Sequence, residues 1–203
     1  MSKIREIEKK IDEVYTNEVF TSKDFLDTTS YNNAKLILSR LISKGKINRV
    51  MDGFYYKNGS YISVYDFVDK IAKMNDWNIC VYGEAALNYL NLSTQVPSKY
   101  IFISDGPYRE YNVFNTVVKF KHTNKNIKNV STKVATILEA LKYLGKGRIG
   151  DNEIEIIKEG MDEQELLELK ECAKKSSVWI YEIVERIVNY DDEIIKKRFR
   201  RYI

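Results

Sequence analysis

The 203-residue chain is predicted to be an α+β protein built from two domains. Residues 16–57 read as two short helices followed by a β-hairpin. Most β-rich runs lie between residues 78 and 122, and apolar residues recur at helical spacing from residue 131 onward. These observations place a first domain at residues 1–60 and a second, mixed α/β domain with a helical C-terminus at residues 61–203.

Composition excludes several classes of protein. The two cysteines, Cys80 and Cys172, lie far apart, and no Cys/His spacing suits a structural zinc site. We expect two reduced, buried thiols in a cytoplasmic protein. No apolar run approaches the roughly 18 residues of a membrane span, and the charged stretch MSKIREIEKKIDEV reads as a helix rather than a signal peptide. No membrane partner is therefore expected.

The first predicted helix carries a narrow apolar seam. Ile4, Ile7, Ile11 and Val14 recur at intervals of three and four residues. The seam can pack against the core of its own domain or against a second copy of the chain. The second option would make the chain a homodimer.

Two helix starts follow at Thr21 and Ser30. Thr21-Ser22-Lys23-Asp24 matches a capping box, in which a hydroxyl and a carboxylate three residues later satisfy the first amides of a helix. A polar turn at residues 27–29 precedes Ser30, a favourable N-cap residue. The second helix is predicted to run to about Lys44 and to stop at Gly45.

The second helix has two contrasting faces. At about 100° per residue, Ala34, Ile37, Leu38 and Leu41 fall on one side and should pack inward. The outward side and its flanks are polar or cationic, apart from one leucine that can touch a thymine methyl or be half buried. Asparagine pairs bidentately with adenine and arginine with guanine. The candidate DNA-binding residues on this helix are Asn32, Asn33, Lys35, Leu36, Ser39 and Arg40.

A β-hairpin completes the predicted winged helix-turn-helix. Asp52-Gly53 between two β-rich runs is a strong hairpin signal. Lys46, Arg49 and Lys57 would lie on this wing and reach phosphates. Residues 1–60 hold 11 Lys/Arg against 8 Asp/Glu, a bias that agrees with DNA contact. Winged helices also dock proteins, so an interaction module for protein or RNA, without sequence-specific DNA binding, is the alternative.

The second domain is predicted to alternate helices and strands before becoming helical. The hydrophobic pattern predicts helices at 65–74 and 84–90 and strands at 78–82, 100–103, 109–113 and 117–122. Further helices are expected at 134–144, 161–174 and 178–188. The segment 196–202 is basic and carries two aromatics. It can be a solvated helix end or can contact nucleic acid or an acidic partner.

No catalytic constellation is recognisable. The chain has a single histidine, His122, and contains no nucleophile-elbow sequence (GxSxG) that would supply a serine for it to activate. No Walker A sequence occurs either. The glycines at 145–150 follow a helix and favour a flexible turn. The turn at Tyr82-Gly83 is similar to the strand-to-helix turn of nucleotidyltransferases. Such enzymes need two carboxylates to hold Mg²⁺, but the next strand here is followed by a single carboxylate, Asp105. We predict no enzyme, catalytic residue, metal or cofactor; a hydrolase that uses Glu84 or Asp105 is the third hypothesis.

Two motifs resemble the AbiEi family of antitoxins, from type IV toxin–antitoxin systems of abortive phage infection. One is LSRLISKGKINRVMDGFYYK, which ends the winged helix; the other is YGEAALNYLNLSTQVPSKYIFISDG, followed by VVKFKHT. The resemblance spans roughly residues 5–125. The matching residues of the second motif are Gly83, Ala85, Ala86, Leu87, Leu90, Leu92, Ser93, Thr94, Gln95 and Pro97.

This resemblance implies two activities. The N-terminal domain would bind double-stranded DNA at inverted repeats in its own promoter and repress the operon. The remainder would counteract a cognate nucleotidyltransferase toxin, with or without direct contact. The family supplies no enzymatic residues, and it leaves open the role of Ser93, Thr94 and Gln95, which can simply form a hydrogen-bonded loop.

Overall fold

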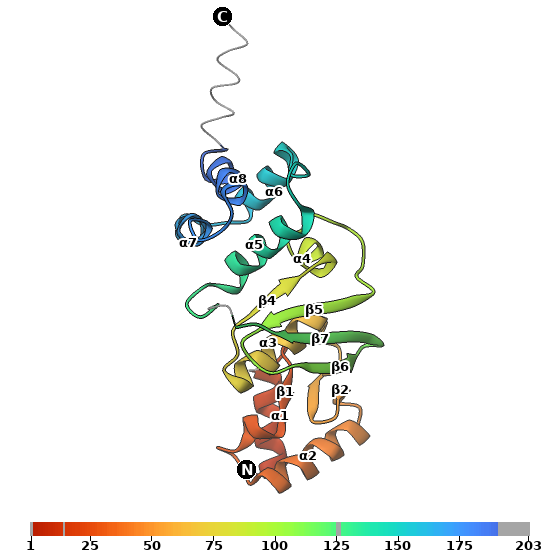
Figure 1. Cartoon of the computed structure of the whole chain (residues 1–203). Coiled ribbons are helices and arrows are strands. Elements are labelled where there is room, and N and C mark those ends of the chain that lie inside the picture. Colours follow the sequence, from red (N-terminus) through yellow and green to blue (C-terminus); the bar gives the residue numbers. More distant parts are fainter. Residues whose placement is uncertain (1, 14, 125–126, 191–203) are drawn as a thin grey trace, which may run out of the picture. The chain divides into compact units, whose positions relative to one another are not determined.

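The computed structural model describes residues 2–13, 15–124 and 127–190 (Figure 1). Within these residues lie eight α-helices and two sheets, so the predicted α+β class is confirmed. The described residues form two compact units. One runs to Asp76 and includes Tyr111–Thr116; the other comprises Trp77–Glu110 and the residues from Val117 onward. This division differs from the predicted boundary after residue 60, because the helix Val64–Asn75 groups with the first unit.

The first unit combines four helical segments with a three-stranded antiparallel sheet. Its elements are α1 (Lys3–Glu13), β1 (Phe20–Thr21), the 3₁₀ helix η1 (Ser22–Phe25), α2 (Tyr31–Ser43), β2 (Ile47–Met51), β3 (Phe54–Lys57) and α3 (Val64–Asn75). The strand order is β1-β3-β2. The hairpin predicted at Asp52-Gly53 joins β2 to β3, and Gly53 has a φ of +84° that a residue with a side chain rarely adopts.

Helix α1 packs within its own unit. Ile7 and Ile11 are buried together with Phe20, Phe25 and the inward residues of α2, and Ile4 packs against them. The aromatic rings of Tyr15, Phe20 and Phe25 meet edge to face or tilted, with centroids 5.4 to 5.8 Å apart. The apolar seam of α1 therefore has a place in this core; Val14, its last predicted member, lies outside the described residues.

The second unit contains a mixed sheet and most of the helices. Its elements are β4 (Ile79–Tyr82), α4 (Glu84–Tyr89), β5 (Lys99–Ser104), β6 (Arg109–Val113), β7 (Thr116–His122), α5 (Thr132–Leu144), α6 (Asp151–Glu159), α7 (Glu163–Ala173) and α8 (Val178–Val188). The sheet order is β4-β5-β7-β6, with β4 and β5 antiparallel and β5 and β7 parallel. The tip of the β6–β7 hairpin, Tyr111–Thr116, is counted with the first unit.

Helix α5 supports the outer edge of β4. Thr136, on the buried side of α5, accepts a hydrogen bond from the Val81 amide at 3.0 Å. Beyond it, α5 to α8 share a separate apolar core that includes Leu141, Ile154, Leu169 and Val184. Helix α6 was not predicted, and its N-terminus is capped by a 2.8 Å hydrogen bond from the Gly150 amide to Glu153.

Two of the side chains that could serve catalysis, Asp105 and His122, have structural partners in the described part of the chain. Asp105 accepts hydrogen bonds from the backbone and the side-chain amide of Asn78, at 2.9 and 2.8 Å. His122 is exposed and lies 2.9 Å from the Gly106 carbonyl, a contact that raises the pKa of the imidazole. Both side chains thus serve to hold turns beside the sheet.

The loop after α4 is closed by hydrogen bonds. Asn88 donates to the carbonyls of Ser93 and Gln95 at 3.4 and 3.3 Å, and the Ser93 hydroxyl accepts from the Gln95 amide at 3.2 Å. These contacts agree with the interpretation that Ser93, Thr94 and Gln95 form a hydrogen-bonded loop. No helix among the described residues has the length and apolarity needed to cross a membrane.

Candidate nucleic-acid interface

Helix α2 divides into a buried and an exposed side, as the sequence predicted. Ala34, Leu38 and Leu41 have no exposed surface and Ile37 has 2%. Ser30 occupies the N-cap position, although its hydroxyl makes no capping hydrogen bond. The helix ends before Gly45, whose φ is +65°. The hydrophobic core of the first unit therefore fixes which side of α2 faces outward.

The predicted contact residues on α2 are not equivalent. The exposed members are Asn32, Lys35, Leu36, Ser39 and Arg40, and Leu36 keeps half of its surface in solvent. Asn33 is half buried, and its side-chain amide donates to the Thr29 hydroxyl at 2.8 Å. Asn33 thus braces the turn before α2, a role that its position on the helix wheel did not indicate.

The three predicted wing residues also differ. Lys46 is exposed just beyond α2. Arg49 reaches Asp52 at 3.0 Å, and its guanidinium lies 5.8 Å from the centre of the Tyr55 ring. Lys57 forms a 2.8 Å ion pair with Asp12 of α1, so its charge is directed toward α1. Arg49 and Lys46 are the wing cations that remain most open to a phosphate.

A groove lies between the start of α2 and the hairpin. It has a volume of about 450 Å³, and its lining includes Lys23, Tyr31, Lys35, Arg49 and Asp52. The Lys35 ammonium sits 5.7 Å from the centre of the Tyr31 ring. The three cations can hold a polyanion, and Asp52 at the tip of the hairpin is the acid among these five residues. Lys23 and Tyr31 were not predicted, because only the fold brings them beside Arg49.

Charge is segregated along the first unit. Between Asp27 and Asp52 the chain holds five Lys/Arg and no Asp or Glu. This segment includes all of α2 and all of β2. A surface on which cations outnumber acids attracts phosphate backbones and releases condensed counterions when it binds them. The absence of acids over this stretch is a signal that the sequence already carried.

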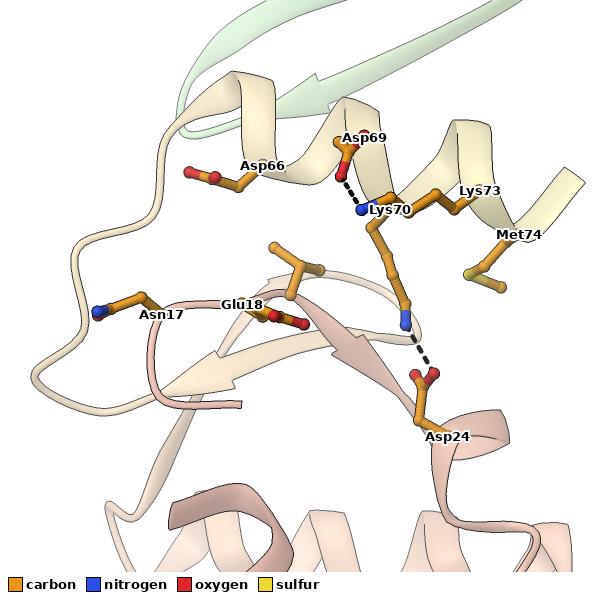
Figure 2. Close-up of a pocket in the computed structure, with 9 residues that line it drawn as sticks. Asn17, Glu18, Asp24, Asp66, Asp69, Lys70, Lys73 and Met74 are labelled. Carbon is orange, nitrogen blue, oxygen red and sulfur yellow. Dashed lines mark hydrogen bonds and ion pairs between the residues drawn. The ribbon is translucent and has the colours of Figure 1, made fainter. Parts of the chain in front are cut away.

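A pocket of the opposite character lies against α3 (Figure 2). Glu18, Asp24, Asp66 and Asp69 line it together with Lys70 and Lys73, around a volume of about 520 Å³. Among the residues that the structure describes, no group of three or more His, Cys, Asp or Glu could hold a metal ion. With four acids and two lysines, this pocket suits a phosphate backbone less well than the groove beside α2.

One ion pair in this pocket joins α3 to the 3₁₀ helix η1 that precedes α2. Lys70 extends from α3 to Asp24 at 2.6 Å, and Figure 2 shows its side chain pointing at that carboxylate. The same Asp24 accepts hydrogen bonds from the amide and hydroxyl of Thr21, at 2.7 and 2.9 Å, which confirms the predicted capping box. Lys10 bonds the carboxylate of Asp27 at 2.7 Å and lowers its pKa. The turn before α2 is thus fixed from two sides.

Lys70 should contribute more to stability than its neighbour Lys73. The Lys70 and Asp24 side chains are 16% and 21% exposed, whereas those of the Lys73–Asp69 pair are 73% and 58% exposed. We expect Lys70→Met to lower the free energy of unfolding by about 1–3 kcal/mol, because Asp24 loses a partner in a poorly hydrated site. The matched change Lys73→Met should cost less than about 0.5 kcal/mol. Urea denaturation of both variants measures this, and equal effects would contradict it.

The described residues thus define an α+β protein with a cationic helix-and-hairpin surface. Residues 6–169 match a family of unknown function, DUF6088. The match covers most of the chain, which therefore belongs to that family. No curated protein matches the chain.

Proposed function

We propose that α1 to β3 form a winged helix-turn-helix that binds double-stranded DNA. The main support is the exposed side of α2, with Arg40 and Lys35 among polar residues and without an acid, next to the hairpin that carries Arg49. Helices of this kind enter the major groove, and an adjacent wing contacts the backbone. The fold and charge favour this partner over others.

In the proposed complex, α2 lies in the major groove. Asn32, Ser39 and Arg40 would face base edges, and Arg40 suits guanine because it offers two parallel donors to O6 and N7. The groove formed with Lys23, Lys35 and Arg49 would hold the phosphates beside the bound helix. Leu36, half exposed on the same side, suits contact with a thymine methyl group.

We also propose a cellular role from the resemblance to AbiEi antitoxins. The chain would act in the cytoplasm as the autorepressor of its own operon, reading inverted repeats as a homodimer. It would also counteract a cognate nucleotidyltransferase toxin. No catalytic residue, metal or cofactor is part of this proposal.

The DNA-binding proposal is tested by fluorescence anisotropy with the full chain. The probe is the duplex upstream of the gene, and a scrambled duplex of equal length and composition is the control. We expect at least about 1,000-fold tighter binding to the upstream duplex at physiological salt, with affinity that falls steeply as salt rises. Equal affinity for both duplexes would refute a sequence-specific repressor.

The antitoxin proposal needs a separate test in cells. The chain is co-expressed with the product of the neighbouring open reading frame, and growth is measured. We expect the neighbour alone to arrest growth and the chain to restore it. A neighbour that is harmless, or whose toxicity persists with the chain present, would refute the antitoxin role without touching DNA binding.

A further inference from the structure

We propose that the second unit binds single-stranded RNA on the exposed face of its sheet. This site is separate from the proposed duplex interface, since the residues that form it belong to the second unit. Strand register, charge and aromatic side chains each support the assignment.

The strand register places a basic row on one face of the sheet. Ile101 of β5 lies opposite Tyr82 of β4 and Lys119 of β7, and Ile103 lies opposite Lys121. Directly opposed residues point to the same face, and residues two apart along a strand do so as well. Lys99, two residues before Ile101, therefore shares this face. The accessible part of this face carries Tyr82, Lys99, Ile101, Lys119 and Lys121. The other part, at Cys80 and Ile103, faces Ala135 and Leu138 of α5 across a pocket, and Cys80 is only 2% exposed.

Away from α5, the two faces of the sheet differ in burial. On the other face, Phe102, Val118 and Phe120 are at most 1% exposed. Lys99 and Lys121 are exposed, while the Lys119 side chain keeps 41% of its surface in solvent and pairs with Glu110 at 2.8 Å. A solvated sheet face ordinarily carries polar residues, and on this face three of them are lysines.

In the second unit, positive charge is concentrated in the segment that forms the sheet and α5. Residues 77–150 hold 10 Lys/Arg against 4 Asp/Glu, a net charge of +6. Residues 151–190 hold 5 Lys/Arg against 11 Asp/Glu, a net charge of −6. A polyanion is therefore attracted to the sheet and to the C-terminal end of α5, and repelled by the helices that follow.

Aromatic rings accompany these lysines. The Lys121 ammonium lies 5.6 Å from the centre of the Tyr82 ring, and the Tyr143 ring meets Tyr82 edge to face at 6.3 Å. Tyr143 is 43% exposed at the end of α5. Unpaired bases stack on such rings while lysines follow the backbone, as in other proteins that bind single strands. Here Lys121 can leave the ring for a phosphate as a base takes its place.

The shape of the surface favours single strands over a duplex. A sheet face has no protruding helix to enter a major groove, and stacking on Tyr82 or Tyr143 requires bases that are not already paired. RNA offers such bases in loops and ends, whereas cellular DNA is mainly duplex. We therefore assign the site to RNA.

The test measures binding of a fluorescent, unstructured 12-nucleotide RNA to the full chain. Two variants probe the site: the charge reversal Lys99→Glu/Lys121→Glu, and Tyr143→Ala. We expect a loss of at least about tenfold from each, and a shallower salt dependence for the charge reversal only. The matched control is Lys174→Glu/Lys175→Glu, which makes the same charge change in the acidic part and should alter affinity less than twofold.

Each other outcome overturns the assignment. If the control loses as much RNA affinity as the sheet variants, the effect comes from net charge and not from a site on the sheet. Tighter binding of single-stranded DNA of the same sequence would remove the preference for RNA. Loss of RNA binding on reversal of Lys35 and Arg40 would place the RNA on α2. The upstream duplex is measured with the same variants, so failure of duplex binding and failure of RNA binding are seen independently.

Discussion

Reversing two charges on α2 should abolish specific binding to the upstream duplex. In the variant Lys35→Glu/Arg40→Glu, two exposed cations of the proposed interface become acids. A base or phosphate contact of this kind contributes about 1–3 kcal/mol, and the new carboxylates repel phosphates, so affinity should fall by more than about 100-fold. Fluorescence anisotropy at several salt concentrations measures the loss, and the slope against salt should decrease by about two charges.

A matched control separates the site from net charge. Lys9→Glu/Lys73→Glu makes the same change on α1 and α3, at side chains that are 63% and 73% exposed. It should leave specificity intact and weaken affinity only slightly. The melting temperature of each variant shows whether the fold persists. If the α2 variant still prefers the upstream duplex, or the control loses as much, DNA is not read by α2.

Removing the Phe25 ring should disrupt the core of the first unit. Phe25 is completely buried and lies 5.8 Å, between ring centres, from both Tyr15 and Phe20. We expect Phe25→Ala to lower the free energy of unfolding of this unit by about 3–5 kcal/mol, through lost transfer energy and the cavity left behind. Circular dichroism during denaturation should show an earlier transition, and duplex binding should be lost at lower temperature.

The tryptophans offer an internal control for this variant. Trp77 and Trp179 both belong to the second unit, so their fluorescence follows that unit. We expect the fluorescence midpoint to move less than the circular dichroism midpoint. The milder change Phe25→Leu should cost less than Phe25→Ala, because it removes less volume. A shift of both signals by the same amount would mean that the two units unfold together.

Locally encoded features of the fold were predictable from the sequence. The capping box at Thr21 depends on two residues that are three positions apart, and the hairpin depends on the two adjacent turn residues, Asp52 and Gly53. The orientation of α2 followed from its apolar period alone, since Ala34 and Leu38 had only one core to enter. For the same reason, most helices and strands of the second unit were placed within a few residues.

Features that depend on distant partners were not predictable. The parallel pairing of β5 with β7 is set by packing, and α6 follows a glycine-rich stretch that favours a turn. Lys57 was predicted to reach phosphates, but its ammonium pairs with the distant Asp12 of α1. The groove lined by Lys23, Tyr31 and Arg49 unites three elements that the sequence separates. The basic stretch 196–202 lies outside the described residues.

The contact between Thr136 and β4 also bears on self-association. The outermost strand of a sheet ordinarily invites another chain to add a strand, which is a common route to aggregation. Here the Thr136 hydroxyl of α5 accepts the hydrogen bond of the Val81 amide, and β4 is only four residues long. Copies of this chain should therefore not extend the sheet at that border, even at the high local concentrations that follow translation.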